Sequence, residues 1–181
     1  MIRFNLAQRL AVLTKLIEAL HKVHSWCGET HIQKAVYFLQ NVREIPLGYD
    51  YVLYKHGPYS FDLAGELATM RGAGVTELAF PVDGYGPSVR LTGMASSLLE
   101  MRDPGVDAVT PIIECVTEWF GNKDVRFLER VATAYYVLRE NPQAGPQIRA
   151  ERLRKLKPHI SEGDSIAAVS ELDRKLRALA Q

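Results

Sequence analysis

The stretch YKHGPYS at residues 54–60 contains the two side chains that come nearest to a catalytic pair in this sequence. Ser60 would be the nucleophile and His56 its base, since a serine hydroxyl needs an adjacent base before it can attack a carbonyl. The two residues are four apart across a turn, and no carboxylate has a matching spacing to orient the imidazole. Ser60 also suits a structural role as the N-cap of the helix that follows. We therefore predict a non-catalytic protein.

A second group of side chains, His21, His24, Cys27 and His31, has the donor atoms that zinc prefers. The first three can share one helix face if the helix continues that far. Gly28 interrupts the pattern at this point, and histidines at a solvated helix end are the commoner arrangement. We therefore predict no metal site and no cofactor.

The most basic run of the chain covers residues 149–157, RAERLRKLK, with a single acidic residue, Glu151. A helix with cations on one face can contact a polyanion such as DNA through its phosphates. A solvated basic face opposite apolar residues is the more ordinary explanation of such a run. The candidate polyanion contacts are Arg149, Arg152, Arg154, Lys155 and Lys157.

The elements that must position these residues are mostly helical. Apolar spacings of three and four predict helices, and short β-branched and aromatic runs predict strands. The predicted helices cover 5–25, 31–41, 60–72 and 93–101, with four more between 107 and 179; the predicted strands cover 49–55, 75–80 and 88–92. This order predicts a mostly α fold with a small antiparallel sheet. We expect a single domain, with a winged-helix-like module at 1–92 and a helical extension at 93–181.

The corner between the first strand and the third helix has a structural explanation. Gly57 can adopt a positive φ, and Pro58 fixes its own φ near −65°. Ser60 then caps the helix. We predict that these three residues form a turn and cap, with Gly57 and Pro58 as the turn.

In a winged-helix fold, the helix after this corner would face DNA. Its predicted outward side carries Asp62 and Glu66 against the single cation Arg71, and the loop at 81–87 adds Asp83. Such a surface is poorly suited to phosphates. A partner protein is therefore the preferred expectation.

The expected contact patch combines a polar face of the second helix with the tyrosine-rich strand. Polar and aromatic side chains of this kind are common in protein interfaces. The predicted partner-binding residues are Gln33, Lys34, Tyr37, Lys55, His56 and Tyr59. The alternative is a DNA-binding transcription regulator that uses the basic helix at 149–157. A homodimer also remains open.

Several segments carry a resemblance to known proteins: HIQKAVYFLQ, YVLYKHGPYSFDLAGELATM, FLERVATAYYVL and RKLKPHIS. Together they resemble the YwgA-like family of small prokaryotic proteins, and more distantly the Panacea (SocA-like) antitoxin domain. The hallmark QK-x-x-Y helix maps to Gln33, Lys34 and Tyr37, the GPYS corner to 57–60, and the LE-x-x-AT helix to 128–133. The resemblance implies a regulatory or antitoxin-like protein that binds a partner, and it implies no catalytic residues.

Composition agrees with an ordinary globular protein. The chain has 181 residues, 47% hydrophobic and 24% charged, with a formal net charge of +1. The first residues contain no apolar signal core, and no uncharged apolar run approaches the ~18 residues that a membrane span needs. The two cysteines are far apart and in no paired motif, which favours reduced thiols. We expect a cytoplasmic protein with no membrane partner.

Overall fold

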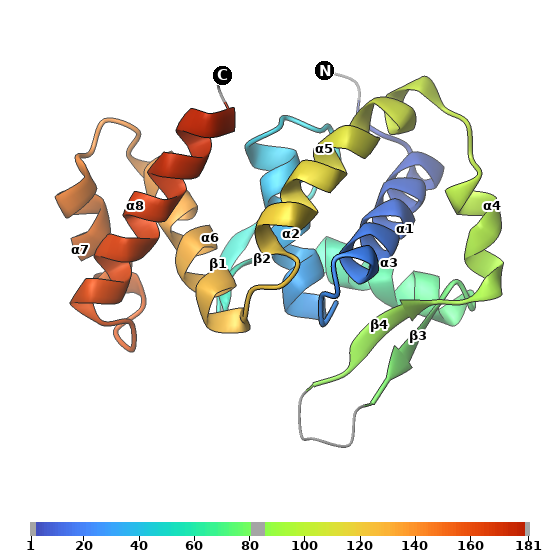
Figure 1. Ribbon diagram of the computed structural model, residues 1–181, viewed down its shortest axis with the longest axis horizontal. Helices are drawn as coiled ribbons and strands as arrows, with labels where there is room; N and C mark the ends of the chain where they lie inside the picture. The colour runs from blue at the N-terminus through green and yellow to red at the C-terminus, as the bar shows by residue number, and fades with distance from the viewer. Residues whose placement is uncertain (1–2, 81–85, 180–181) are drawn as a thin grey trace. The chain divides into compact units, whose positions relative to one another are not determined.

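The computed structural model of the chain describes residues 3–80 and 86–179 (Figure 1). It confirms a mostly α fold with small antiparallel sheets. The chain forms two compact units: residues 1–52 with 59–123, and residues 53–58 with 124–181. The sequence placed the division at residue 92. It falls later because α5 (Pro104–Phe120) packs on helices of the N-terminal half.

The core of the first unit is helical. Helices α1 (Leu6–Lys22) and α2 (Glu29–Asn41) both contact α5. Asn5 and Gln8 form a reciprocal capping box at the start of α1, and Asp103 accepts hydrogen bonds from the first backbone N–H groups of α5. An aromatic cluster joins α2 to α5, because the Phe38 ring lies 5.1 Å from Trp119 and 4.7 Å from Phe120.

The segment YKHGPYS at residues 54–60 belongs to a hairpin, whereas the sequence predicted a strand that leads directly into a helix. Strand β1 (Val52–Tyr54) pairs with β2 (Gly57–Tyr59), and the turn is at Lys55 and His56. The sequence prediction of Gly57 and Pro58 as the turn is therefore wrong. Gly57 does have a positive φ of 85°. Ser60 accepts a hydrogen bond from the Leu63 N–H at 3.3 Å, which confirms it as the N-cap of α3 (Phe61–Gly72).

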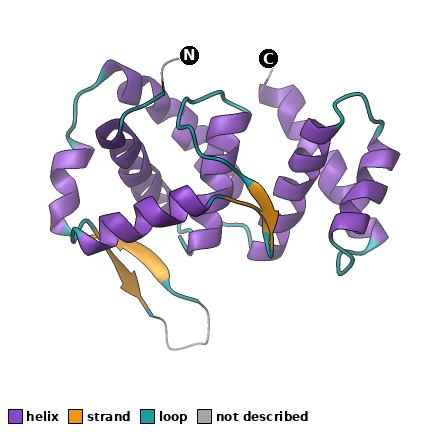
Figure 2. Ribbon diagram, turned by 180° about the vertical axis from the view of Figure 1, so that it is seen from behind, coloured by secondary structure: helices purple, strands orange, loops and turns teal. Residues whose placement is uncertain are grey.

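The two strands predicted after α3 form the second hairpin. Strands β3 (Thr76–Ala79) and β4 (Ser88–Leu91) are antiparallel, with Thr76 opposite Leu91 and Ala79 opposite Ser88. Figures 1 and 2 show this ribbon extending from the helices of its unit. Asp83, in the predicted loop, lies outside the described residues. A short segment follows, with η1 (Gly93–Ala95) and α4 (Ser96–Leu99), and Thr92 caps it.

The second unit is built on three helices that contact one another: α6 (Val125–Glu140), α7 (Pro146–Leu156) and α8 (Glu162–Leu179). Their apolar sides meet in a small core that includes Leu128, Leu153 and Leu172. Pro146 at the start of α7 has the fixed φ that suits the first helical position. In the part of the chain that the structure describes, no helix is both long and apolar enough to cross a membrane.

Candidate functional site

The face of α2 that the sequence assigned to a partner is buried. Gln33, Lys34 and Tyr37 are 0%, 1% and 0% exposed. The prediction that these three side chains form part of an exposed contact patch is therefore wrong. Their neighbours explain why, because the covering element is a segment of the same chain.

Two glutamines of α2 bind the backbone of this covering segment, one at Tyr49 and the other at Ser60. Gln33 donates from Nε2 to the Ser60 carbonyl and accepts at Oε1 from the Ser60 N–H, both at 2.9 Å. Gln40 makes the same pair of bonds with the backbone of Tyr49, both at 2.7 Å. A side-chain amide offers one donor group and one acceptor, as a peptide does. Each glutamine therefore makes the pair of hydrogen bonds that a residue of a neighbouring strand would otherwise make.

Tyr37 fills the space between the two glutamines. Its ring lies 4.8 Å from that of Tyr51 in an edge-on arrangement. Positions 33, 37 and 40 lie on one side of a helix, since residues three and four apart are neighbours on its surface. The α2 face therefore binds Tyr49, Tyr51 and Ser60 of its own chain, the residues on either side of the first hairpin.

Part of the first unit near this hairpin remains accessible. Phe61 is 61% exposed, and Val52 is 48% exposed. The ring of Tyr59 lies 5.1 Å from that of Phe61, and its hydroxyl donates to Glu29 Oε1 at 2.6 Å. We call Val52, Tyr59 and Phe61 the hairpin surface. Of the predicted contact residues, Tyr59 is half-buried here.

Lys55 and His56, at the tip of the same hairpin, are exposed and belong to the second unit. The His56 Nδ1 lies 3.8 Å from Oε2 of Glu129, a buried carboxylate on α6. His56 is therefore accessible at one edge of its ring while the other faces an acid. The contact between His56 and Glu129 could not be predicted from sequence spacing, because the two residues are 73 positions apart in the chain.

Glu129 is the centre of a charged cluster in the second unit. Lys157 Nζ and His159 Nε2 each lie 3.2 Å from Glu129 Oε1. Lys157 also donates to the carbonyls of Tyr54 and Lys55, at 2.5 and 2.7 Å. We call Glu129, His56, Lys157 and His159 the Glu129 cluster.

The Glu129 cluster ties together three of the segments that carried the family resemblance. The YKHGPYS hairpin supplies His56, the LE-x-x-AT helix supplies Glu129, and RKLKPHIS supplies Lys157 and His159. Its chemistry is that of a buried ion pair that holds a β-turn, because the ammonium group of Lys157 binds the turn carbonyls and the carboxylate neutralises it. Among the described residues, no group of three or more histidine, cysteine or acidic side chains can hold a metal ion.

The basic helix proposed for polyanion binding is largely neutralised. Arg149 is buried and makes a bidentate pair with Asp173, at 2.8 and 2.6 Å. Lys157 is buried in the Glu129 cluster, just past the end of α7. Each of these two was predicted as an exposed cation, and that prediction is wrong. Two of the remaining cations also face acids: Arg152 lies 3.5 Å from Glu140 and Arg154 lies 3.1 Å from Glu162, while Lys155 is exposed.

The electrostatic prediction for α3 is also corrected. Glu66 does not face solvent as an unpaired anion, because Arg9 Nη2 lies 2.6 Å from Oε1 and the Tyr49 hydroxyl donates to Oε2 at 2.6 Å. Burial, followed by the hydrogen bond to this carboxylate and its charge, raises the pKa of Tyr49 well above its usual value. The outer side of α3 is consequently near neutral, with Asp62 and Arg71 at its two ends.

The residues considered for catalysis and metal binding have other contacts. Ser60 is fully buried and caps α3. The imidazoles of His21 and His31 bond the carbonyls of Val89 and Lys123, at 2.8 and 2.9 Å. Cys27 is buried, and its desolvation raises the pKa of the thiol to about 12, so it stays protonated at neutral pH.

A comparison with models of known protein families finds no match for the chain. A comparison with curated proteins likewise finds no match. The likeness to the YwgA-like family and to the Panacea domain therefore depends on the sequence motifs given above.

Proposed function

We propose that this protein is a non-catalytic regulatory or antitoxin-like module that binds a partner polypeptide through the hairpin surface. The observation that carries the proposal is the exposure of Phe61 and Val52 beside an anchored tyrosine. Aromatic side chains with a fixed orientation contribute most of the binding energy in many protein interfaces. Tyr59 has such an orientation, because Glu29 holds its hydroxyl.

The pairing of the α7 cations favours a protein partner over DNA. A helix that binds phosphates needs cations that are free to replace counterions. Arg149 and Lys157 are instead buried against Asp173 and Glu129. A cytoplasmic setting forms part of the proposal, since both cysteines are free thiols.

The test is affinity capture of the full chain from nuclease-treated lysate of its native cells, compared among three baits by quantitative mass spectrometry. The baits are the wild type, Phe61→Ser and the matched control Ile166→Ser, which removes an exposed aliphatic side chain from α8. We expect one partner protein to be recovered in a near-equimolar ratio to the bait, both with the wild type and with the control Ile166→Ser. Loss of an interface anchor costs about 2 kcal/mol or more, so recovery with Phe61→Ser should fall at least severalfold.

Equal recovery of every protein with all three baits would contradict the proposal. If the only protein that the tagged bait captures is the untagged chain itself, the hairpin surface is a contact between two copies of this protein. Circular dichroism of each bait checks that the fold is retained, which we expect because both substituted side chains are largely exposed.

A further inference from the structure

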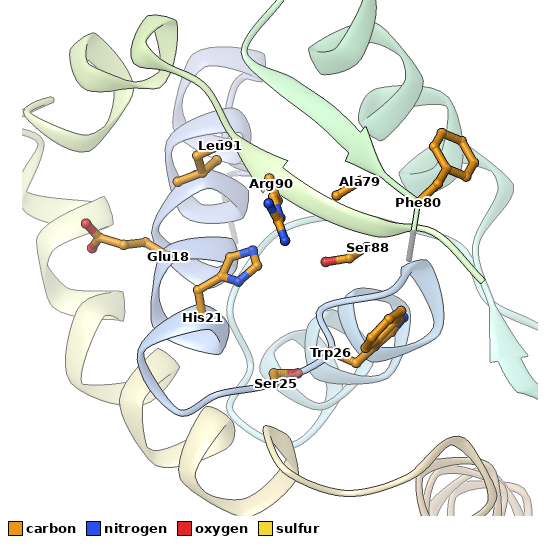
Figure 3. Close-up of a pocket in the computed structure, with 9 residues that line it drawn as sticks. All are labelled: Glu18, His21, Ser25, Trp26, Ala79, Phe80, Ser88, Arg90 and Leu91. Carbon is orange, nitrogen blue, oxygen red and sulfur yellow. The ribbon is translucent and has the colours of Figure 1, made fainter. Parts of the chain in front are cut away.

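The first unit contains a pocket of about 590 Å³ that is separate from the hairpin surface (Figure 3). It lies between the C-terminal part of α1, the loop from α1 to α2, and strands β3 and β4. Small-molecule sites commonly have volumes of roughly 300–1,000 Å³ and combine apolar walls with a few polar groups. The residues that line this pocket have that combination.

The loop that forms the floor of the pocket is fixed in an unusual conformation. His24 and Cys27 have positive φ angles of 57° and 49°, a region that non-glycine residues seldom adopt. They flank Ser25 and Trp26, which both line the pocket. The Val89 N–H donates to the Cys27 carbonyl at 2.9 Å and so joins the loop to β4. Strained backbone of this kind is concentrated at binding sites.

One side of the pocket is aromatic. Trp26 donates from Nε1 to the Gly86 carbonyl at 3.1 Å, which fixes the orientation of the indole. Gly28 lies beneath it, because a Cβ there would be only 3.1 Å from Trp26 Cδ1. Phe80 also lines the pocket and is 75% exposed, and its ring points away from the indole in Figure 3. The fixed indole of Trp26 offers a flat apolar surface that suits an aromatic ligand.

The other side of the pocket carries the cation Arg90. Arg90 points toward its middle, and the ring of His21 lies beside it (Figure 3). His21 donates from Nε2 to the Val89 carbonyl at 2.8 Å, since a carbonyl can only accept, and this bond fixes the ring. Among the described residues that line the pocket, Glu18 is the one acid; it pairs with Lys22 at 2.8 Å, and its carboxylate points away from Arg90. Glu77 stands opposite Arg90 in the β3–β4 register, and the planar Arg90 guanidinium is directed into the pocket in Figure 3.

We propose that this pocket binds a small planar aromatic anion, with its ring against Trp26 and its carboxylate or phosphate group on Arg90. A guanidinium group binds either anion through two parallel hydrogen bonds. Occupation would connect strand β4 to the loop between α1 and α2, because Arg90 and Trp26 come from these elements. The protein would then respond to a small ligand in addition to binding a partner.

The test is isothermal titration calorimetry of the full chain with naphthoate and with naphthyl phosphate. Naphthamide, which lacks the charge, and cyclohexanecarboxylate, which lacks the aromatic ring, are the control ligands. We expect at least one of the two aromatic anions to bind at one site per chain, and both control ligands to bind much more weakly. The preferred anion distinguishes a carboxylate from a phosphate ligand.

Three variants locate the binding. Arg90→Gln should weaken binding about tenfold or more, since a hydrogen bond to a charged group is lost. Trp26→Leu should weaken it severalfold through loss of ring contact. Arg71→Gln, which removes an exposed arginine at the end of α3, should leave it unchanged. Failure of both aromatic anions to bind the wild type would overturn the proposal, as would equal affinity of Arg90→Gln and Arg71→Gln.

Discussion

At the scale of single residues, the most informative side chains are the two glutamines of α2. Gln33 and Gln40 each satisfy both the N–H and the carbonyl of one backbone residue. Buried backbone groups that lack a partner cost about 1–3 kcal/mol each. The glutamines therefore make it possible for the backbone of Tyr49 and Ser60 to lie on a helix without a neighbouring strand.

Substitution of Gln33 by leucine should lower the free energy of unfolding by about 2–4 kcal/mol, because both backbone groups of Ser60 lose their partner. Urea unfolding followed by circular dichroism measures this difference. Gln147→Leu, at an exposed position of α7, is the matched control and should change stability by no more than about 0.5 kcal/mol. A similar small effect at both positions would show that the Gln33 bonds do not stabilise the fold.

At the scale of elements, helix α5 carries an internal proline. Pro111 is exposed, and it stands in the middle of a helix that provides much of the core of the first unit. A proline there removes a backbone donor and places its ring against the preceding turn. The apolar face of α5, with Val109, Ile113 and Val116, stabilises the helix despite this cost.

Pro111→Ala should therefore stabilise the protein by about 1–3 kcal/mol, the range set by the difference in helix propensity between the two residues. Thermal unfolding should show a higher midpoint temperature. Pro104→Ala is the control within the same helix, since Pro104 occupies the first helical position, where proline is tolerated. If Pro111→Ala raises the midpoint temperature no more than Pro104→Ala does, Pro111 does not destabilise α5.

At the scale of the whole molecule, charge pairing decides which partners are favoured. The formal net charge is +1, and two of the five cations between 149 and 157 are buried in ion pairs. The outer side of α3 has no cluster of cations among its described residues, because Arg71 is its one basic side chain. Neither helix therefore presents a strong phosphate-binding surface.

We accordingly expect labelled duplex DNA to bind no more tightly than about 1 μM at physiological salt, the range of non-specific association. Fluorescence anisotropy measures this affinity. Neutralising the acids that pair with α7, by Glu140→Gln with Glu162→Gln, should strengthen binding by freeing Arg152 and Arg154. Tight binding by the wild type that weakens steeply with salt and is lost in Lys155→Gln would instead support a DNA-binding regulator.

Local features of the fold could be predicted from the sequence because they depend on short-range chemistry. The cap at Ser60, the positive φ at Gly57 and the strands β3 and β4 all follow from residue types and spacings within a few positions. The hairpin turn was placed two residues too late, because Gly-Pro resembles a turn whether or not a strand pairs with it. Burial could not be predicted in the same way.

The sequence by itself determined the helical content, the strands β3 and β4 and a third helix with few cations. Only the tertiary structure decided which side chains face solvent. Gln33, Lys34 and Tyr37 are polar or amphipathic, and such residues lie at a surface unless a distant segment satisfies them. Ser60 satisfies Gln33, just as Glu129 satisfies Lys157 from a separate helix. These pairings join positions far apart in the chain, and no local spacing records them.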